Sequence, residues 1–316
     1  MNRYDRYIRI LSGVVGVLAA IYGAALLFDP ETVNARNASF TWLEKKQADQ
    51  ADRIELSGAE GAVTLVRKEG VWFSSRNNTE YPAKQMRIND FLNILTAKGR
   101  YPVRGTSAAS FERFGLAEGK ASRAVIRGGL SEHPLLDLLI GGTDGAGREI
   151  YLRSSGGTEV RSGEDKISAY IDGSPTAWFD LRLFPESLQA ESVQRLTVYA
   201  PPSEEEPAPA PLVFARQDGG WTVTGVPEAD TQRVESYIRS ILEAEGADFL
   251  EDTRIGDRAG SLLLELGNGQ TRAVRIGSLT ESNQRNAEVE GSSFKYVLAE
   301  WTVNRLFRNG SYFARQ

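Results

Sequence analysis

The feature that most restricts the fold is a pattern of elements that the sequence contains twice. The first half carries RKEGVW at 67–72 after an alternating stretch typical of a strand, and the second half carries RQDGGW at 216–221 in the same setting. Arg, an acid, Gly and Trp recur in the same order, so Trp72 and Trp221 are expected in matching strands. Such self-similarity predicts an internal duplication, with two copies of one supersecondary arrangement.

An amphipathic helix is predicted after the Gly-Trp strand of each copy. The apolar residues there follow the spacing 0, 3, 4, 7, which places them on one helical face. Each copy then returns to strands, at 138–142 and at 274–278. The predicted helix faces consist of Ile88, Phe91, Leu92 and Leu95 in the first copy, and of Val234, Tyr237, Ile238 and Ile241 in the second.

Each copy is predicted to end in a short closing helix that contains a tryptophan. WFDLRLF at 178–184 and WTVNRLF at 301–307 share Trp, Arg, Leu and Phe at the same offsets. Trp and Arg four residues apart lie on one helical face, so we expect stacked pairs that close a layer of each copy. Anion binding by the two arginines is the alternative. The predicted structural repeat residues are Trp72, Trp221, Trp178, Trp301, Arg182 and Arg305.

A membrane anchor is predicted at residues 10–28, an apolar run without a charge. As a helix this run spans about 28 Å, close to the bilayer core of roughly 30 Å. Arg3, Arg6 and Arg9 precede it, so the N-terminus is expected in the cytoplasm. Cleavage of a signal peptide after Ala35 is the competing interpretation. Small residues that would permit close contact with another membrane helix are Ser12, Gly16, Ala20 and Ala24.

These elements predict an α+β protein with an N-terminal transmembrane helix and two tandem β-rich repeats. Each repeat is expected to hold one amphipathic helix and one closing helix with its tryptophan. The predicted organisation is a cytoplasmic N-terminus at 1–9, the anchor at 10–28, a linker at 29–52, a first ectodomain repeat at 53–188 and a second at 193–316.

Composition excludes several classes of function. The net charge of -5 disfavours a nucleic-acid partner, because such proteins need a basic surface to displace counterions from phosphates. The chain has no cysteine, which removes disulfides, thiolate metal sites and cysteine nucleophiles.

Candidate catalytic motifs are weak throughout the chain. His133 is the only histidine and has no G-x-S-x-G or H-E-x-x-H motif beside it. The glycine-rich segment at 141–147 lacks the Lys-Ser/Thr ending of a phosphate loop and is predicted to be a hairpin turn. We therefore predict no catalytic, cofactor-binding or metal-ligating residue. Acids whose spacing does not fit a calcium loop are Asp248, Glu251, Asp252 and Asp257.

The whole pattern resembles a known bacterial family. An N-terminal span, a Gly-x-Trp strand, an amphipathic helix and the ending WTVNRLFRNGSYF at 301–313 are similar to the family called domain of unknown function 4340. The resemblance covers residues 53–313. It implies a membrane-anchored extracytoplasmic protein, often encoded near ABC-type export or gliding-type transport components, and it brings no catalytic residues.

Two functions follow as hypotheses. The first is a noncatalytic accessory or scaffold subunit, held in the cytoplasmic membrane and bound to a protein partner such as a transporter permease. The second is an extracytoplasmic protein that binds a glycan or peptide in a cleft between the repeats. An enzyme is a third class, which a pocket with two carboxylates of separated pKa would favour.

Overall fold

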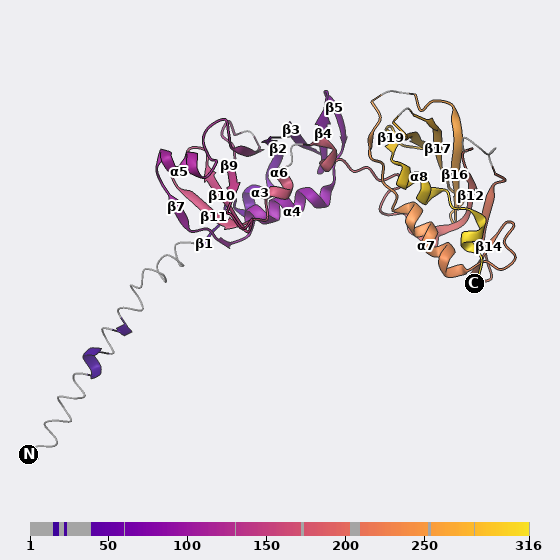
Figure 1. Ribbon diagram of the computed structural model, residues 1–316, viewed down its shortest axis with the longest axis horizontal. Coiled ribbons are helices and arrows are strands. Elements are labelled where there is room, and N and C mark those ends of the chain that lie inside the picture. Colours follow the sequence, from indigo (N-terminus) through magenta and orange to yellow (C-terminus); the bar gives the residue numbers. More distant parts are fainter. Residues whose placement is uncertain are drawn as a thin grey trace, which may run out of the picture. The chain divides into compact units, whose positions relative to one another are not determined.

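The computed structural model describes most of the chain beyond residue 38 (Figure 1). It describes residues 15–18, 22–23, 39–59, 61–129, 131–171, 174–202, 209–251, 254–280 and 282–315. They belong to two compact units, Met1–Trp178 and Phe179–Gln316. Each unit combines one large antiparallel sheet with helices, so the predicted α+β class is confirmed.

The predicted anchor at 10–28 lies outside the described residues, apart from helical pieces at 15–18 and 22–23. Gly16 lies in the first piece. Within the described part of the chain, no helix combines the length and the apolar composition that a membrane crossing requires. The anchor and its orientation remain predictions. The small residues outside the description are Ser12, Ala20 and Ala24.

The first unit is built on a sheet with nine strands among its described residues, in the order β5-β4-β3-β2-β8-β9-β10-β11-β7. Most neighbours are hairpin partners, and β7 joins the far edge after a helical crossover. The bounds are β2 (Ala51–Gly58), β3 (Gly61–Lys68), β4 (Val71–Arg76), β5 (Thr79–Pro82), β7 (Val103–Gly105), β8 (Ser122–Gly128), β9 (Leu136–Thr143), β10 (Glu149–Ser154) and β11 (Val160–Glu164).

Helix α4 (Gln85–Thr96) covers this sheet (Figure 1) with its predicted apolar face, which is buried as expected. Burial of that face removes its apolar surface from water, the main favourable term in packing a helix on a sheet. The remaining elements are a ribbon of β1 (Ser39–Phe40) with β6 (Gly99–Arg100), the helices α3 (Lys45–Asp49), α5 (Ala108–Arg113) and α6 (Ser168–Ile171), and the 3₁₀ helix η1 (Pro175–Trp178).

The second unit repeats this order with eight strands in its described part, β14-β13-β12-β16-β17-β18-β19-β15. Its long helix α7 (Thr231–Leu242) also buries the predicted face. The other elements are η2 (Ala190–Ser192), β12 (Val193–Tyr199), β13 (Leu212–Gln217), β14 (Gly220–Val223), β15 (Asp248–Phe249), β16 (Arg258–Leu266), β17 (Thr271–Leu279), β18 (Arg285–Val289), β19 (Lys295–Leu298), α8 (Glu300–Leu306) and η3 (Gly310–Phe313).

Two-residue turns join β3 to β4 and β13 to β14. Glu69 and Gly70 have φ of 51° and 85°, and Asp218 and Gly219 have φ of 44° and 80°. Positive φ at both central residues matches the right-handed twist of the flanking strands and explains the repeated acid-Gly pair.

The tryptophans after these turns lie in matching places, as expected. Trp72 and Trp221 are buried on β4 and β14. The Trp72 N–H donates to Gln85 Oε1 at 3.0 Å, and the Trp221 N–H donates to Thr231 Oγ1 at 3.3 Å. Gln85 and Thr231 are the first residues of α4 and α7, so each hairpin is tied to the start of its helix.

The expected match between Trp178 and Trp301 is wrong. Trp178 ends η1 and is fully buried, whereas Trp301 lies in α8 with 56% of its surface exposed. The residue that corresponds to Trp178 is Phe313, which ends η3 and is also fully buried. The carbonyl of Trp178 accepts from the N–H of Lys84 at 2.8 Å, and that of Phe313 accepts from Asp230 at 2.9 Å. Those two donors are the N-cap residues of α4 and α7.

The segment after Trp178 is not the predicted helix. Residues 179–184 have no helical turn, and Phe179, Leu181 and Leu183 are buried at alternate positions within the second unit. The Leu183 N–H donates to the Ala244 carbonyl at 3.0 Å, so this backbone bonds to the chain after α7. A period of two, rather than 3.6, decides the conformation here.

Candidate functional site

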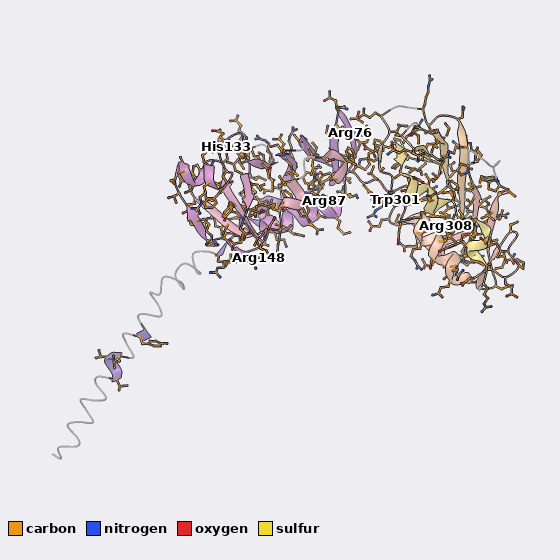
Figure 2. The ribbon with its side chains drawn as sticks, in the orientation of Figure 1. Arg76, Arg87, His133, Arg148, Trp301 and Arg308 are labelled. Atoms are coloured by element: carbon orange, nitrogen blue, oxygen red, sulfur yellow. The ribbon has the colours of Figure 1, made fainter. Side chains whose placement is uncertain are left out.

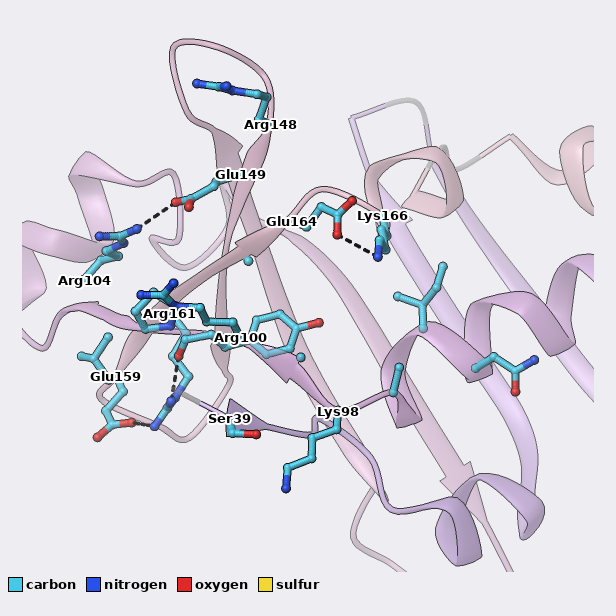
Figure 3. Close-up of a pocket in the computed structure, with 18 of the residues that line it drawn as sticks. Ser39, Lys98, Arg100, Arg104, Arg148, Glu149, Glu159, Arg161, Glu164 and Lys166 are labelled. Carbon is cyan, nitrogen blue, oxygen red and sulfur yellow. Dashed lines mark hydrogen bonds and ion pairs between the residues drawn. The ribbon is translucent and has the colours of Figure 1, made fainter. Parts of the chain in front are cut away.

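The largest hollow among the described residues is an open groove of ≈ 1700 Å³ in the first unit (Figure 3). It lies where the β1–β6 ribbon passes the β7–β11 edge of the sheet and the last turns of α4. Its charged lining residues are Asp90, Lys98, Arg100, Arg104, Arg148, Glu149, Glu159, Arg161, Glu164 and Lys166.

Tyr101 is wedged beside this groove between two glycines. A Cβ added to Gly99 would lie 2.7 Å from Tyr101 Cε2, and one added to Gly163 would lie 2.3 Å from Cε1. The ring also packs edge-on against Trp42, with centroids 5.5 Å apart. Burial raises the pKa of the Tyr101 hydroxyl, so the side chain stays neutral at physiological pH.

We expect Gly163→Ala to destabilise the first unit by about 1 to 3 kcal/mol, because the new methyl group overlaps a ring that is already packed. Denaturant unfolding measures the change. Gly145→Ala is the matched control, since an added Cβ there meets no described atom within 4 Å, and it should cost less than about 0.5 kcal/mol. Equal effects of the two substitutions would contradict the wedge.

Three ion pairs hold part of the groove's charge. Arg104 Nη2 lies 3.0 Å from Glu149 Oε2, and Lys166 Nζ lies 2.7 Å from Glu164 Oε2. The hydrogen bond from Glu164 raises the pKa of Lys166. The third pair joins Arg161 to Glu159, and Arg161 also donates to the Tyr101 carbonyl at 2.9 Å. These pairs fix the positions of half of the lining cations.

Sequence reasoning did not find this groove. Its residues come from segments far apart in the chain, which only the sheet edge brings together. A usable signal was the basic run KGRYPVR at 98–104, which places three cations within one short connection.

Trp178 has a different arginine partner from the one expected. The Arg87 guanidinium of α4 lies 4.8 Å from the Trp178 ring centroid and 4.9 Å from that of Tyr170. Arg182 instead pairs with Glu186 at 2.9 Å and with Asp180 at 3.8 Å. The hydrogen bond from Glu186 raises the pKa of the Arg182 guanidinium. Arg182 is thus part of a local surface ion-pair group.

Two exposed aromatic–arginine pairs lie near the C-terminus (Figure 2). The Arg305 guanidinium lies 5.1 Å from the ring of Trp301, which confirms the expected stacking in this copy. Arg308 lies 5.3 Å from the ring of Tyr312, which is 43% exposed. Neither arginine forms an ion pair within the described part of the chain. We call these four residues the C-terminal aromatic–arginine pairs.

The weak catalytic candidates stay apart. His133 is exposed in the turn before β9 (Figure 2), where its N–H donates to Ser131 Oγ at 3.2 Å. The glycine-rich segment is the β9–β10 hairpin, as expected, and Asp144 closes it by accepting from two backbone N–H groups, which lower the pKa of its carboxyl. No group of three His, Cys, Asp or Glu residues that could hold a metal occurs among residues the structure describes.

Comparison with known proteins gives one match. The model of the family described as Domain of unknown function (DUF4340) matches residues 72–260, more than half of the chain and parts of both units. This confirms the resemblance noted from the sequence. No curated protein matches the chain.

Proposed function

The chain belongs to the DUF4340 family, and from this premise we propose that it is a noncatalytic accessory or scaffold subunit of an ABC-type transport or cell-envelope system. Residues 10–28 would anchor it in the cytoplasmic membrane as a single span. The arginines before the span would keep the N-terminus inside, with the two units on the extracytoplasmic side. Its partner would be a membrane protein such as a transporter permease.

One observation carries the docking role: the exposed C-terminal aromatic–arginine pairs. Trp, Tyr and Arg are the residues most enriched at the energetic centres of protein interfaces. A tryptophan that is more than half exposed leaves apolar surface in water, which a partner would cover. The stacked Arg305 holds the indole in place, so little side-chain freedom would be lost on binding.

We expect Trp301→Ala to abolish association with the partner while thermal stability stays unchanged. Loss of an interface centre weakens binding by at least about tenfold, whereas an exposed substitution changes stability by less than about 0.5 kcal/mol. Crosslinking of the full chain in native membranes, with identification of the crosslinked proteins, measures association.

Leu279→Ala is the matched control for this experiment. Leu279 is another exposed apolar residue of the second unit, on β17, and its loss should leave crosslinking intact. If Trp301→Ala preserves the crosslinked protein, or if both variants lose it, these pairs are not the docking site.

We also propose that the two units arose by duplication, with 53–188 and 193–316 as the copies. Support comes from the common strand order, the two acid-Gly turns and the paired roles of Trp178 and Phe313. Each copy would contain one amphipathic helix, as predicted.

A ligand-binding role is the alternative function. Its support is the groove within the first unit, lined mainly by charged side chains and by one aromatic residue, Tyr101. A glycan platform would present several aromatic faces to its ligand, so the chemistry of this groove suits a charged ligand better.

A further inference from the structure

We propose that the groove of the first unit binds a phosphate-bearing anion between Arg148 on one wall and Lys98 with Arg100 on the other. Figure 3 shows Arg148 at the tip of its loop, with Lys98 and Arg100 across the hollow. All three side chains are exposed, and none forms an ion pair or side-chain hydrogen bond within the described ranges.

The balance of charge in the groove favours an anion. Its other three cations are neutralised by Glu149, Glu159 and Glu164 in the ion pairs described above. Among the described lining residues, Asp90 is then the one acid without an ion pair, against three cations. A positive hollow in a chain of net charge -5 attracts anions at a defined place rather than over the whole surface.

The placement of these cations on opposite walls favours phosphate over carboxylate. A carboxylate presents two oxygens in one plane on one side, which a single guanidinium can satisfy. A phosphate group is tetrahedral, so its oxygens can accept from Arg148 on one side and from Lys98 or Arg100 on the other. The open form of the groove leaves room for the remainder of a larger molecule.

Two sources of phosphate share this chemistry. Ser39 lines the groove, and only residues 29–38 separate it from the proposed anchor, at most about 36 Å of extended chain. Headgroups of anionic lipids are therefore within reach, an argument that rests on the proposed membrane location. A soluble compound with several phosphates would meet the same three cations.

The test uses the full chain and the double variant Arg100→Glu/Arg148→Glu. Calorimetric titration with tripolyphosphate should show binding that weakens at least about tenfold in this variant, and also weakens as salt is raised. Lys45→Glu/Lys46→Glu is the matched control, with the same change in charge on two exposed lysines of α3 outside the groove. Unchanged melting temperatures show that both variants are folded.

A second arm identifies the source. Full chain in nanodiscs of phosphatidylcholine, with or without phosphatidylglycerol, is compared by hydrogen exchange at β6 and at the β9–β10 turn. Slower exchange only with phosphatidylglycerol, lost in the groove variant, assigns lipid headgroups; tripolyphosphate binding without that effect assigns a soluble phosphate compound. The proposal fails if neither ligand acts on the groove or if the control variant loses binding equally.

The location of the protein is tested separately. A reporter that is active only outside the membrane, fused after Gln316, should be active. Tripolyphosphate binding by a chain whose reporter is inactive would keep the anion site and reject the proposed location.

Discussion

Replacing Trp178 by alanine is expected to destabilise the first unit by about 3 to 5 kcal/mol, a large part of the stability of a typical domain. The indole is fully buried, packs edge-on against Phe91 with centroids 6.1 Å apart, and lies under the Arg87 guanidinium. Its removal leaves a cavity at the point where η1 meets the start of α4. Hydrogen exchange of the full chain measures the effect, and the α4 amides should lose protection by at least about a hundredfold.

Two comparisons define this result. The α7 amides report on the second unit and should keep their protection in Trp178→Ala. Trp301→Ala removes an equally large side chain from an exposed place and should leave both helices protected. Unchanged protection of α4 in Trp178→Ala would show that the aromatic contacts around η1 contribute little.

Phe313→Ala should destabilise the second unit by a similar amount, about 3 to 5 kcal/mol. The ring is fully buried, 4.8 Å from the centroid of Phe214 and 4.9 Å from that of Tyr237. Phe214 belongs to the sheet and Tyr237 to α7, so Phe313 fills the space between the helix and the sheet. Here the α7 amides should lose protection, measured in the same exchange experiment.

Tyr312→Ala provides the neighbouring control. Tyr312 is 43% exposed, and its loss should change stability by less than about 0.5 kcal/mol. If Tyr312→Ala and Phe313→Ala destabilise α7 equally, the position of η3 rather than the buried ring supports the helix. That outcome would remove the paired roles of Trp178 and Phe313.

Elements with a strong local pattern were predicted well. Helices α4 and α7 follow from apolar residues at helical spacing, and their buried faces contain the expected residues. The turns before Trp72 and Trp221 follow from an acid-Gly pair, because such pairs tolerate positive φ. In these cases the local conformational preference and the tertiary packing favour the same structure.

The tail shows where a short sequence match misleads. WFDLRLF and WTVNRLF share four residues, but the first continues from η1 into an extended segment and the second forms α8. The alternating burial of Phe179, Leu181 and Leu183 depends on the second unit, which supplies backbone partners after α7. A few identical residues do not encode which neighbour will satisfy the backbone.

The sequence by itself determined the class of the fold, the two helix faces, the repeated hairpin turns and the family. Those properties depend on residues close together in the chain, whose spacing and backbone preferences act locally. Tertiary structure alone decided that Phe313 matches Trp178, that Trp301 is exposed and that Lys98, Arg100 and Arg148 line one groove. These depend on strand order and on contacts between distant segments, which fold together only when the sheet assembles.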